Sequence, residues 1–199
     1  MQTISNAIQL SHILIKSVLS RNNVYNIVDA TAGNGNDTLF LAQNMQKYTK
    51  LYAFDIQESA LNSAKKNIQE NSMDIANCDN IKFICDSHDR IDAYVLGNID
   101  LAIFNLGYLP GGNHDITTKC ETTKKAVQIV LDKLSLNGCL AIVLYSAHEE
   151  GLKEANLLRE FLENLPKKYF TAGYYQMVNH NINAPALCWI EKVKLRSNN

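Results

Sequence analysis

Short apolar runs alternate with longer segments of helical periodicity, and this alternation constrains the fold more than any other feature of the sequence. The strand-like runs cover residues 25–29, 51–55, 81–85, 99–105, 138–145, 169–178 and 186–194. Apolar residues recur at helical spacing over residues 5–20, 36–46, 57–70, 89–96, 117–134 and 149–164. Strands that alternate with helices are typical of βαβ units and a mainly parallel sheet.

Two details sharpen this prediction. Runs such as IDLAIF and CLAIVLY are apolar throughout, as expected of strands covered on both faces. A short connector joins the last two strands, which predicts an antiparallel hairpin at one edge of the sheet. We therefore predict one α/β domain over residues 1–199, a Rossmann-like, doubly wound, mostly parallel seven-stranded sheet with a C-terminal antiparallel hairpin. An extra N-terminal helix, at about residues 5–20, would flank the sheet or cover its site.

Composition excludes several classes of protein. Nineteen Lys and Arg against twenty Asp and Glu leave a formal charge of −1, which excludes wrapping of nucleic acid by bulk charge. No apolar stretch approaches the roughly 20 residues of a membrane span, and the N-terminus lacks signal-peptide features. The five cysteines are scattered, without a C-x-x-C pair, at positions 78, 85, 120, 139 and 188. We therefore expect no disulfide framework, no metal site and a cytoplasmic location.

Polar residues at the carboxyl ends of the strands are the candidates for chemistry, because doubly wound sheets bind ligands beyond those ends. The first end carries a glycine-rich loop whose candidate cofactor-binding residues are Asp29, Thr31, Gly33, Asn34, Gly35, Asn36, Asp37 and Thr38. A dinucleotide loop would place Gly or Ala where Thr38 stands. An acceptor at Asp29 suits the methionine amine of S-adenosylmethionine (SAM) better. A tight strand–helix turn without ligand is the alternative.

The second and third ends supply further carboxylates. The candidate cofactor-binding residues there are Asp55, Ile56, Gln57, Asp86, Ser87 and His88. Asp55 lies twenty residues after Gly35 and could accept both ribose hydroxyls of a nucleoside. Asp86 could accept the exocyclic amine of adenine. At both ends the alternative is a helix cap, because a helix is predicted to follow.

The fourth end, FNLGYLPGG, places Asn105 at a strand terminus and Tyr108 three residues later. Nitrogen methyltransferases often carry Asn/Asp-Pro-Pro-aromatic at this point, and Leu-Gly replaces Pro-Pro here. The Asn105 carbonyl could hold the N–H groups of an attacking amine beside the cofactor, while Tyr108 stacks on a flat base. The neighbouring candidates for substrate binding are Leu106, Gly107, Pro110 and Gly111. A Gly/Pro loop capped by a buried Asn is the alternative.

Two histidines are further candidates. His148 follows the fifth strand and could accept a proton, or merely begin the next helix. His12 lies on the apolar-rich face of the first helix and could contact substrate, or be a satisfied interior histidine. Asn181 and Asn183 lie in a late loop that we expect at the rim of the site.

The segments DATAGNGNDTLFLA, FDIQESAL, CDSH, FNLGYLPGG, VLYSAHEEG and NHNINAPALCWIEK resemble, in this order, a family of small bacterial class I methyltransferases. Its members were long described as rRNA methylases and are now understood as tRNA 5-(aminomethyl)-2-thiouridine methyltransferases. The resemblance covers roughly residues 8–192, and FNLGYLPGG is its most specific element. It implies that SAM is the cofactor and the tRNA anticodon stem-loop the partner, with Asn105 and Tyr108 facing the wobble uridine. A homodimer is left open.

The sequence departs from the family after PGG, where Asn113 and His114 replace the usual Asp-Lys. This puts a basic RNA contact in doubt. The candidate phosphate contacts are Lys124, Lys125, Lys167, Lys168, Lys192, Lys194 and Arg196. The alternatives are an rRNA-base or protein-glutamine N-methyltransferase, a SAM- or RNA-binding module without catalysis, and a nicotinamide-dependent enzyme.

Overall fold

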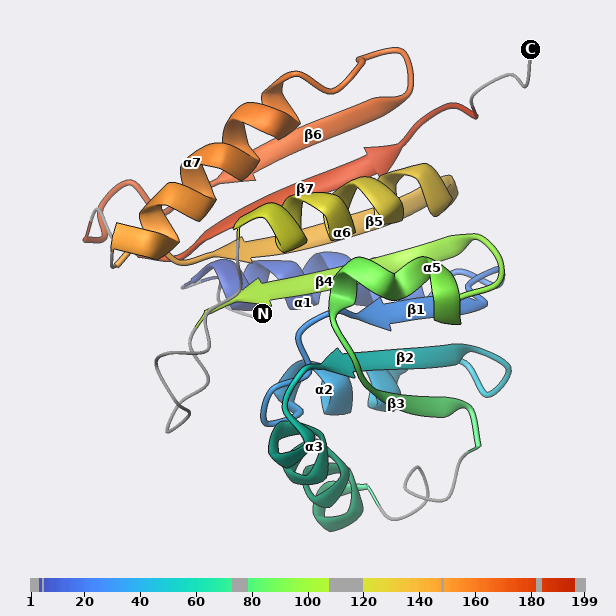
Figure 1. Ribbon diagram of the computed structural model, residues 1–199. Helices are drawn as coiled ribbons and strands as arrows, with labels where there is room; N and C mark the ends of the chain where they lie inside the picture. Colours follow the sequence, from blue (N-terminus) through green and yellow to red (C-terminus); the bar gives the residue numbers. More distant parts are fainter. Residues whose placement is uncertain are drawn as a thin grey trace.

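A seven-stranded sheet forms the centre of the molecule in the computed structural model, which describes residues 4, 6–72, 79–107, 120–147, 149–181 and 184–195. The strand order is β3-β2-β1-β4-β5-β7-β6 (Figure 1). The strands are β1 (Asn26–Asp29), β2 (Lys50–Asp55), β3 (Ile81–Cys85), β4 (Ile99–Leu106), β5 (Leu134–Leu144), β6 (Phe170–Tyr175) and β7 (Ala186–Lys192). The pairings of β7 with β5 and with β6 are antiparallel, and those among β1 to β5 are parallel, so the predicted C-terminal pairing is confirmed.

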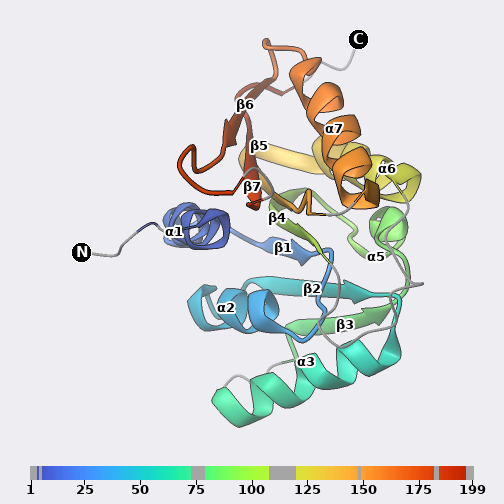
Figure 2. The same ribbon diagram turned by 90° about the vertical axis from the view of Figure 1, so that its left-hand side faces the viewer.

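Helices cover both faces of this sheet (Figure 2). The helices are α1 (Ala7–Leu19), α2 (Asn36–Asn44), α3 (Glu58–Asn71), the short η1 (His88–Arg90), α5 (Ile91–Tyr94), α6 (Cys120–Lys133) and α7 (Glu149–Glu163). In Figure 2, α1 and α2 lie on one side of the strands, and α5, α6 and α7 lie on the other. The structure thus has the doubly wound methyltransferase fold that the sequence predicts.

Alternate residues of the central strands enter two separate cores. In β4, Leu101 and Ile103 pack with α1 and α2, whereas Ala102 and Phe104 pack with α6. All four side chains are buried. This explains why the strand is apolar throughout, because neither face has contact with water.

The register brings the carboxyl ends of the central strands to one edge. Asp29 of β1 pairs with Ala53 of β2 and with Ile103 of β4. The chain reverses its direction of sheet growth between β1 and β4, the point at which doubly wound sheets bind ligands. The loops after these two strands are therefore where a ligand site is expected.

Several predicted boundaries differ from the structure by one to three residues, and two elements differ further. β5 begins at Leu134, four residues before the predicted start, because Leu134 pairs with Ile99 ahead of a register shift. Asn137 then turns the chain with a φ of 62°. The predicted helix over residues 89–96 is a 3-10 turn, η1, followed by the single turn of α5. Among the described residues, no helix is long and apolar enough to span a membrane.

Candidate functional site

The glycine loop between β1 and α2 packs tightly against α3. Gly33 and Gly35 have φ values of 51° and 81°, a region that glycine enters without steric cost. A Cβ on Gly35 would lie 2.5 Å from the Ala64 Cα of α3. The glycine at position 35 is therefore required by both its backbone conformation and its packing. This fixes the loop close to the carboxyl end of β1.

Asp29 ties the two ends of this loop together. Its side chain is 0% exposed and accepts hydrogen bonds from Thr38 Oγ1 at 2.6 Å and from the Thr31 N–H at 3.1 Å. Burial, followed by the charge of Asp37, raises the pKa of Asp29 to about 7. Asp29 thus anchors the loop from beneath, with both carboxylate oxygens already hydrogen-bonded.

Asp55 bridges the glycine loop and the start of α3. One carboxylate oxygen accepts the Gly33 N–H and the other accepts the Gln57 N–H, both at 2.9 Å. Gln57, and not Asp55, is the N-cap of α3 and makes no side-chain cap hydrogen bond, so the alternative prediction that Asp55 caps this helix is wrong. Each carboxylate oxygen can accept a second hydrogen bond, so the two contacts leave capacity for a ligand hydroxyl. Ile56 beside it is 54% exposed, an apolar surface next to a polar one.

Asp86, after β3, is held by three neighbours. It accepts hydrogen bonds from Tyr94 Oη at 2.6 Å and the Ser87 N–H at 2.8 Å, and its oxygen lies 3.0 Å from Arg90 Nη1. The hydrogen bond from Tyr94 is the main reason why the pKa of Asp86 lies below its usual value. Ser87 caps η1 by accepting the Asp89 N–H, as the alternative interpretation of this segment expects.

His88 carries an unsatisfied polar atom. The ring is buried, lies edge-on to Phe104 and is hydrogen-bonded to the backbone of Ala30. Its Nε2 has no hydrogen-bond partner among the described residues. Burial lowers the pKa of His88, which keeps the ring neutral near pH 7. A buried nitrogen without a partner at this edge suits a ligand that offers a hydrogen bond.

Asn105 lies at the centre of a network that spans three elements. Its backbone N–H donates to Thr31 Oγ1 at 2.7 Å, and its side-chain Nδ2 donates to Asp37 Oδ2 at 2.9 Å. The other Asp37 oxygen lies 2.7 Å from His12 Nε2 of α1. His12 also stacks on Phe40, with ring centroids 3.8 Å apart. The predicted residues His12, Asp37 and Asn105 are therefore brought together.

Two residues that the sequence interpretation gave no role complete this network. Tyr145, after β5, has the Asn105 side chain as a neighbour. Burial raises the pKa of Tyr145, so its phenol keeps its proton at neutral pH. A Cβ on Gly107 would lie 3.2 Å from the Tyr145 ring, which explains the glycine there. Tyr145 could have been found from its place at a strand end, whereas Phe40 reads as an ordinary core residue.

Several other predicted site residues are either not described by the structure or lie away from this network. The substrate and catalytic candidates Tyr108, Pro110, Gly111, His148 and Asn183 lie outside the described residues, as do Asn113 and His114. Leu106 is buried in the core beneath the site. Asn181 is exposed, and its carbonyl accepts the Ala184 N–H. Asn34 and Asn36 contact Asn67 of α3 at the outer side of the loop.

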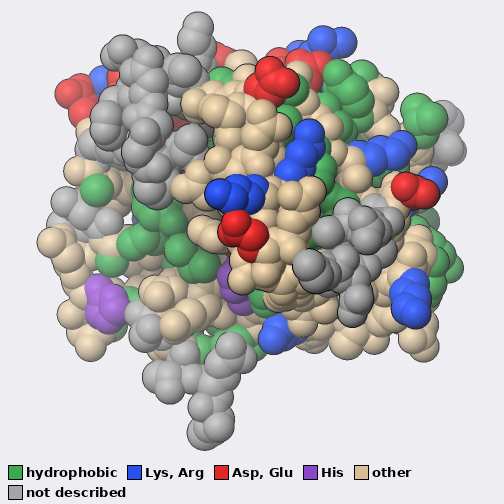
Figure 3. Space-filling view, turned by 90° about the horizontal axis from the view of Figure 1, so that it is seen from below, with side chains coloured by type: hydrophobic (Ala, Val, Ile, Leu, Met, Phe, Trp, Pro, Cys, Tyr) green, Lys and Arg blue, Asp and Glu red, His purple; other side chains and the backbone are tan. Residues whose placement is uncertain are grey.

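Two of the lysines predicted to contact RNA are engaged in contacts within the protein. Lys192 is only 5% exposed, and its Nζ donates to the carbonyls of Leu131, Asp132 and Leu134 at the end of α6. The prediction that it contacts phosphate is therefore wrong. Lys125 pairs with Asp89 at 3.0 Å. On the face drawn in Figure 3, Lys and Arg side chains are interspersed with Asp and Glu, with no single basic patch.

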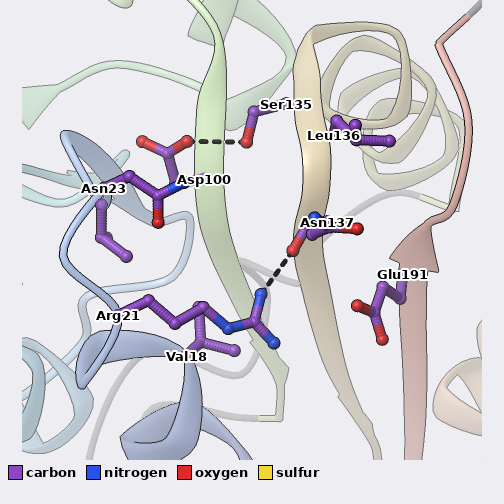
Figure 4. Close-up of a pocket in the computed structure, with 9 residues that line it drawn as sticks. Val18, Arg21, Asn23, Asp100, Ser135, Leu136, Asn137 and Glu191 are labelled. Carbon is purple, nitrogen blue, oxygen red and sulfur yellow. Dashed lines mark hydrogen bonds between the residues drawn. The ribbon is translucent and has the colours of Figure 1, made fainter.

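A separate cavity of about 290 Å³ lies at the opposite ends of the strands (Figure 4). Arg21 donates to the Asn137 carbonyl across it at 2.7 Å, and Ser135 donates to Asp100 at 2.6 Å. Asp100 also accepts the backbone N–H groups of Tyr25 and Asn26. These contacts join the starts of β1, β4 and β5. The cavity is therefore part of the framework and not of the candidate site. Within the described ranges, no group of three His, Cys, Asp or Glu could hold a metal ion.

Comparisons with known proteins agree with the fold. A family model described as "Putative rRNA methylase" matches residues 51–191. The chain is 29% identical over 193 residues to "tRNA (mnm(5)s(2)U34)-methyltransferase, chloroplastic" of Arabidopsis thaliana, covering 94% of this chain and 69% of the relative. A "putative rRNA-methylase" from Clostridium thermocellum has a TM-score of 0.88 at 34% identity and covers 96% and 100% of the two chains. A "putative methyltransferase" from Streptococcus mutans in complex with SAH has a TM-score of 0.83 at 37% identity, covering 96% and 99%.

Proposed function

The chain belongs to the family described as "Putative rRNA methylase", and from this premise we propose that it is a SAM-dependent N-methyltransferase acting on tRNA. Its substrate in this proposal is the aminomethyl group of the wobble uridine, which becomes methylaminomethyl. The observation that carries the proposal is the Asn105 amide, held by Asp37 at the carboxyl end of β4. The relative from Arabidopsis, whose name specifies position 34 of tRNA, supports the choice of substrate. We also propose that residues 1–199 form one methyltransferase domain.

The described residues fit a nucleoside cofactor with a cationic amino-acid end. Asp55 has free acceptor capacity beside the exposed Ile56, and His88 Nε2 is a buried polar atom that has no partner in the part of the chain that the structure describes. The turn at Gly33 and Gly35 lets backbone approach a ligand closely. We propose that Asp55 holds the ribose, residues 86–88 the adenine side, and the loop that follows Asp29 the methionine moiety. When bound, SAM supplies an activated methyl group on a positively charged sulfur.

The protein's own contribution is orientation of the amine. Asn105 Nδ2 donates to the Asp37 carboxylate, so the carbonyl Oδ1 of the same amide is left to accept an N–H from the substrate. An amine held in this way points its lone pair in one direction. Fixing the two reacting groups at contact distance removes much of the entropic cost of their encounter.

The amine must also be neutral to attack. Tyr145 is unsuited to act as a base near pH 7 because its pKa is raised and its phenol is protonated. The proposed acceptor His148 lies outside the described residues. The fraction of the amine that is already neutral can react, with its proton passing to water. The site therefore needs to orient the amine more than it needs a strong base.

The proposed partner is the tRNA anticodon stem-loop. Looped-out bases are commonly read by stacking on aromatic side chains, and Tyr108 is the proposed platform. We retain Lys124, Lys167, Lys168 and Lys194 as phosphate contacts, since Lys125 pairs with Asp89 and Lys192 is engaged with α6. Arg196 lies outside the described residues. With few basic contacts, RNA affinity should be modest and salt-sensitive. We also propose a cytoplasmic location, because Cys85, Cys120, Cys139 and Cys188 are free thiols.

Nucleoside mass spectrometry of tRNA tests this function. Bulk tRNA is compared between cells with the gene, cells without it, and the deletion complemented with an Asn105→Ala copy. We expect the deletion and the Asn105→Ala strain to lose the methylaminomethyl nucleoside and to accumulate its aminomethyl precursor. An unchanged tRNA profile would refute the assignment, and rRNA and proteins would then be assayed for loss of a methyl group.

A further inference from the structure

Three side chains from distant parts of the sequence form one continuous chain of hydrogen bonds. His12 of α1 contacts Asp37 of α2 at 2.7 Å, and Asp37 contacts Asn105 of β4 at 2.9 Å. The His12 and Asp37 side chains are 24% and 7% exposed, so water competes little for the Asp37 carboxylate. A hydrogen bond to a charged group in such surroundings is stronger than one at the surface.

The carboxylate dictates which way the Asn105 amide faces. An ionised carboxylate only accepts hydrogen bonds, so the group that Asn105 turns toward Asp37 must be its NH₂. The Asn105 side chain also has Tyr145 as a neighbour. The donation to Asp37 comes from the nitrogen side of the amide. Its carbonyl oxygen therefore remains available for the substrate.

His12 is held in place by two independent contacts. Its ring is nearly parallel to the Phe40 ring, at an interplanar angle of 8°, and its Nε2 reaches Asp37. Asp37 needs such a partner because Asp29 lies nearby and the two carboxylates repel each other. Without His12, the Asp37 carboxylate would lose one of the two side chains that fix its position beside Asn105.

We propose that His12 and Asp37 are positioning residues for methyl transfer, which fix the Asn105 amide with its carbonyl oxygen facing the substrate amine. The inference rests on the proposed function and gives the N-terminal helix α1 a part in catalysis. His12 acts through Asp37 and Asn105, and needs no contact with the reacting atoms.

Two substitutions of His12 separate this role from simple packing. His12→Gln keeps an N–H donor for Asp37 but loses the aromatic stack on Phe40. His12→Phe keeps the stack but loses the donor. Lys16→Met is the matched control, since Lys16 lies on the same helix with its Nζ 5.6 Å from the centre of the Phe40 ring.

The experiment measures single-turnover methyl transfer at saturating SAM, with tRNA that carries the aminomethyl precursor, and SAM affinity by calorimetry. We expect His12→Phe to slow transfer by about 10- to 100-fold, because a misoriented acceptor loses part of the orientation effect. His12→Gln should remain within a few-fold of the parent, and Lys16→Met should equal it. SAM affinity should stay unchanged in all three variants.

Transfer by His12→Phe at the parental rate, or faster than by His12→Gln, would overturn the inference, as would a loss of SAM affinity that accounts for the slower transfer. An inactive parent protein would instead refute the proposed function. In that case the side-chain ¹⁵N–¹H₂ signals of Asn105 still test the positioning role. They should keep their position and slow solvent exchange in His12→Gln and lose both in His12→Phe. Identical Asn105 signals in the two variants would overturn the inference.

Discussion

The carboxylate of Asp29, at the end of β1, accepts a hydrogen bond of 2.6 Å from Thr38 Oγ1, at the start of α2. The glycine loop is thus closed at its base by a fully buried acid. A ligand on the outer side of this loop would therefore contact the loop backbone and Asp55, while Asp29 holds the loop in place from the protein interior. Four predictions about different parts of the molecule can be measured separately.

The first consequence concerns pH. Burial raises the folded-state pKa of Asp29 to about 7 from an unfolded value of 3.8, so the folded protein binds this proton more tightly than the unfolded chain. Its contribution to stability is fully present below about pH 3.8 and is lost as the pH rises through about 7. Urea unfolding of the parent and of Asp29→Asn between pH 5 and pH 8 measures it. The parent should lose stability relative to the variant over this range. A constant difference between the two would contradict the buried acid.

The second consequence concerns the glycine loop. Gly35→Ala should destabilise the fold by roughly 2–4 kcal/mol, because it forces an L residue into the left-handed region and drives its Cβ into Ala64. Gly97→Ala is the control, since its Cβ would meet only Asn26 Nδ2 at an ordinary 3.4 Å. Urea denaturation should show a change below about 0.5 kcal/mol there. Equal effects of the two substitutions would mean that the loop does not pack on α3 as described.

The third consequence concerns the buried lysine. Lys192→Met should cost about 1–3 kcal/mol, because it leaves the last carbonyls of α6 without their donor and removes a positive charge from a helix C-terminus. Lys194→Met, two residues later and exposed, should be nearly neutral. Thermal or urea unfolding of both variants provides the comparison. A stable Lys192→Met protein with weakened RNA binding would support the phosphate contact that the structure rejects.

The fourth consequence concerns Asn105. Asn105→Ala should slow single-turnover transfer by about 100-fold or more while changing SAM affinity only a few-fold, because the amine loses its acceptor and the cofactor keeps Asp55. Asn164→Ala removes an exposed asparagine of similar size at the end of α7 and serves as the control. Rates that match between the parent and Asn105→Ala would sink the orienting role of this amide.

Much of the fold could be predicted because it depends on local sequence patterns. Apolar strands, amphipathic helices and the glycine loop each depend on residues close in sequence, and the order of elements leaves few topologies. The early start of β5 escaped prediction because it depends on pairing of Leu134 with Ile99, thirty-five residues away. The 3-10 turn over residues 88–90, which Ser87 caps, precedes α5 at residue 91. The sequence could not distinguish such a turn from the irregular end of one longer helix.

Individual site residues could be predicted from the sequence, but the hydrogen bonds between them could not. Asp37 and His12 were each candidates for separate roles, yet their pairing joins residues 25 positions apart, and Asn105 is a further 68 positions away from Asp37. Lysine at position 192 looked like a surface cation because sequence alone does not show that the end of α6 reaches its ammonium group. Contacts of this kind arise only when the sheet brings its strand ends together.

Methyl transfer by the purified protein to defined tRNA tests the central claim most directly. The substrate is tRNA whose wobble uridine carries the aminomethyl group, and the matched control is the same tRNA with an unmodified wobble uridine. With isotopically labelled SAM, we predict one label per tRNA, located in the methylaminomethyl nucleoside, and none in the control. Equal labelling of both tRNAs, or none of either with a SAM-binding protein, would contradict the account.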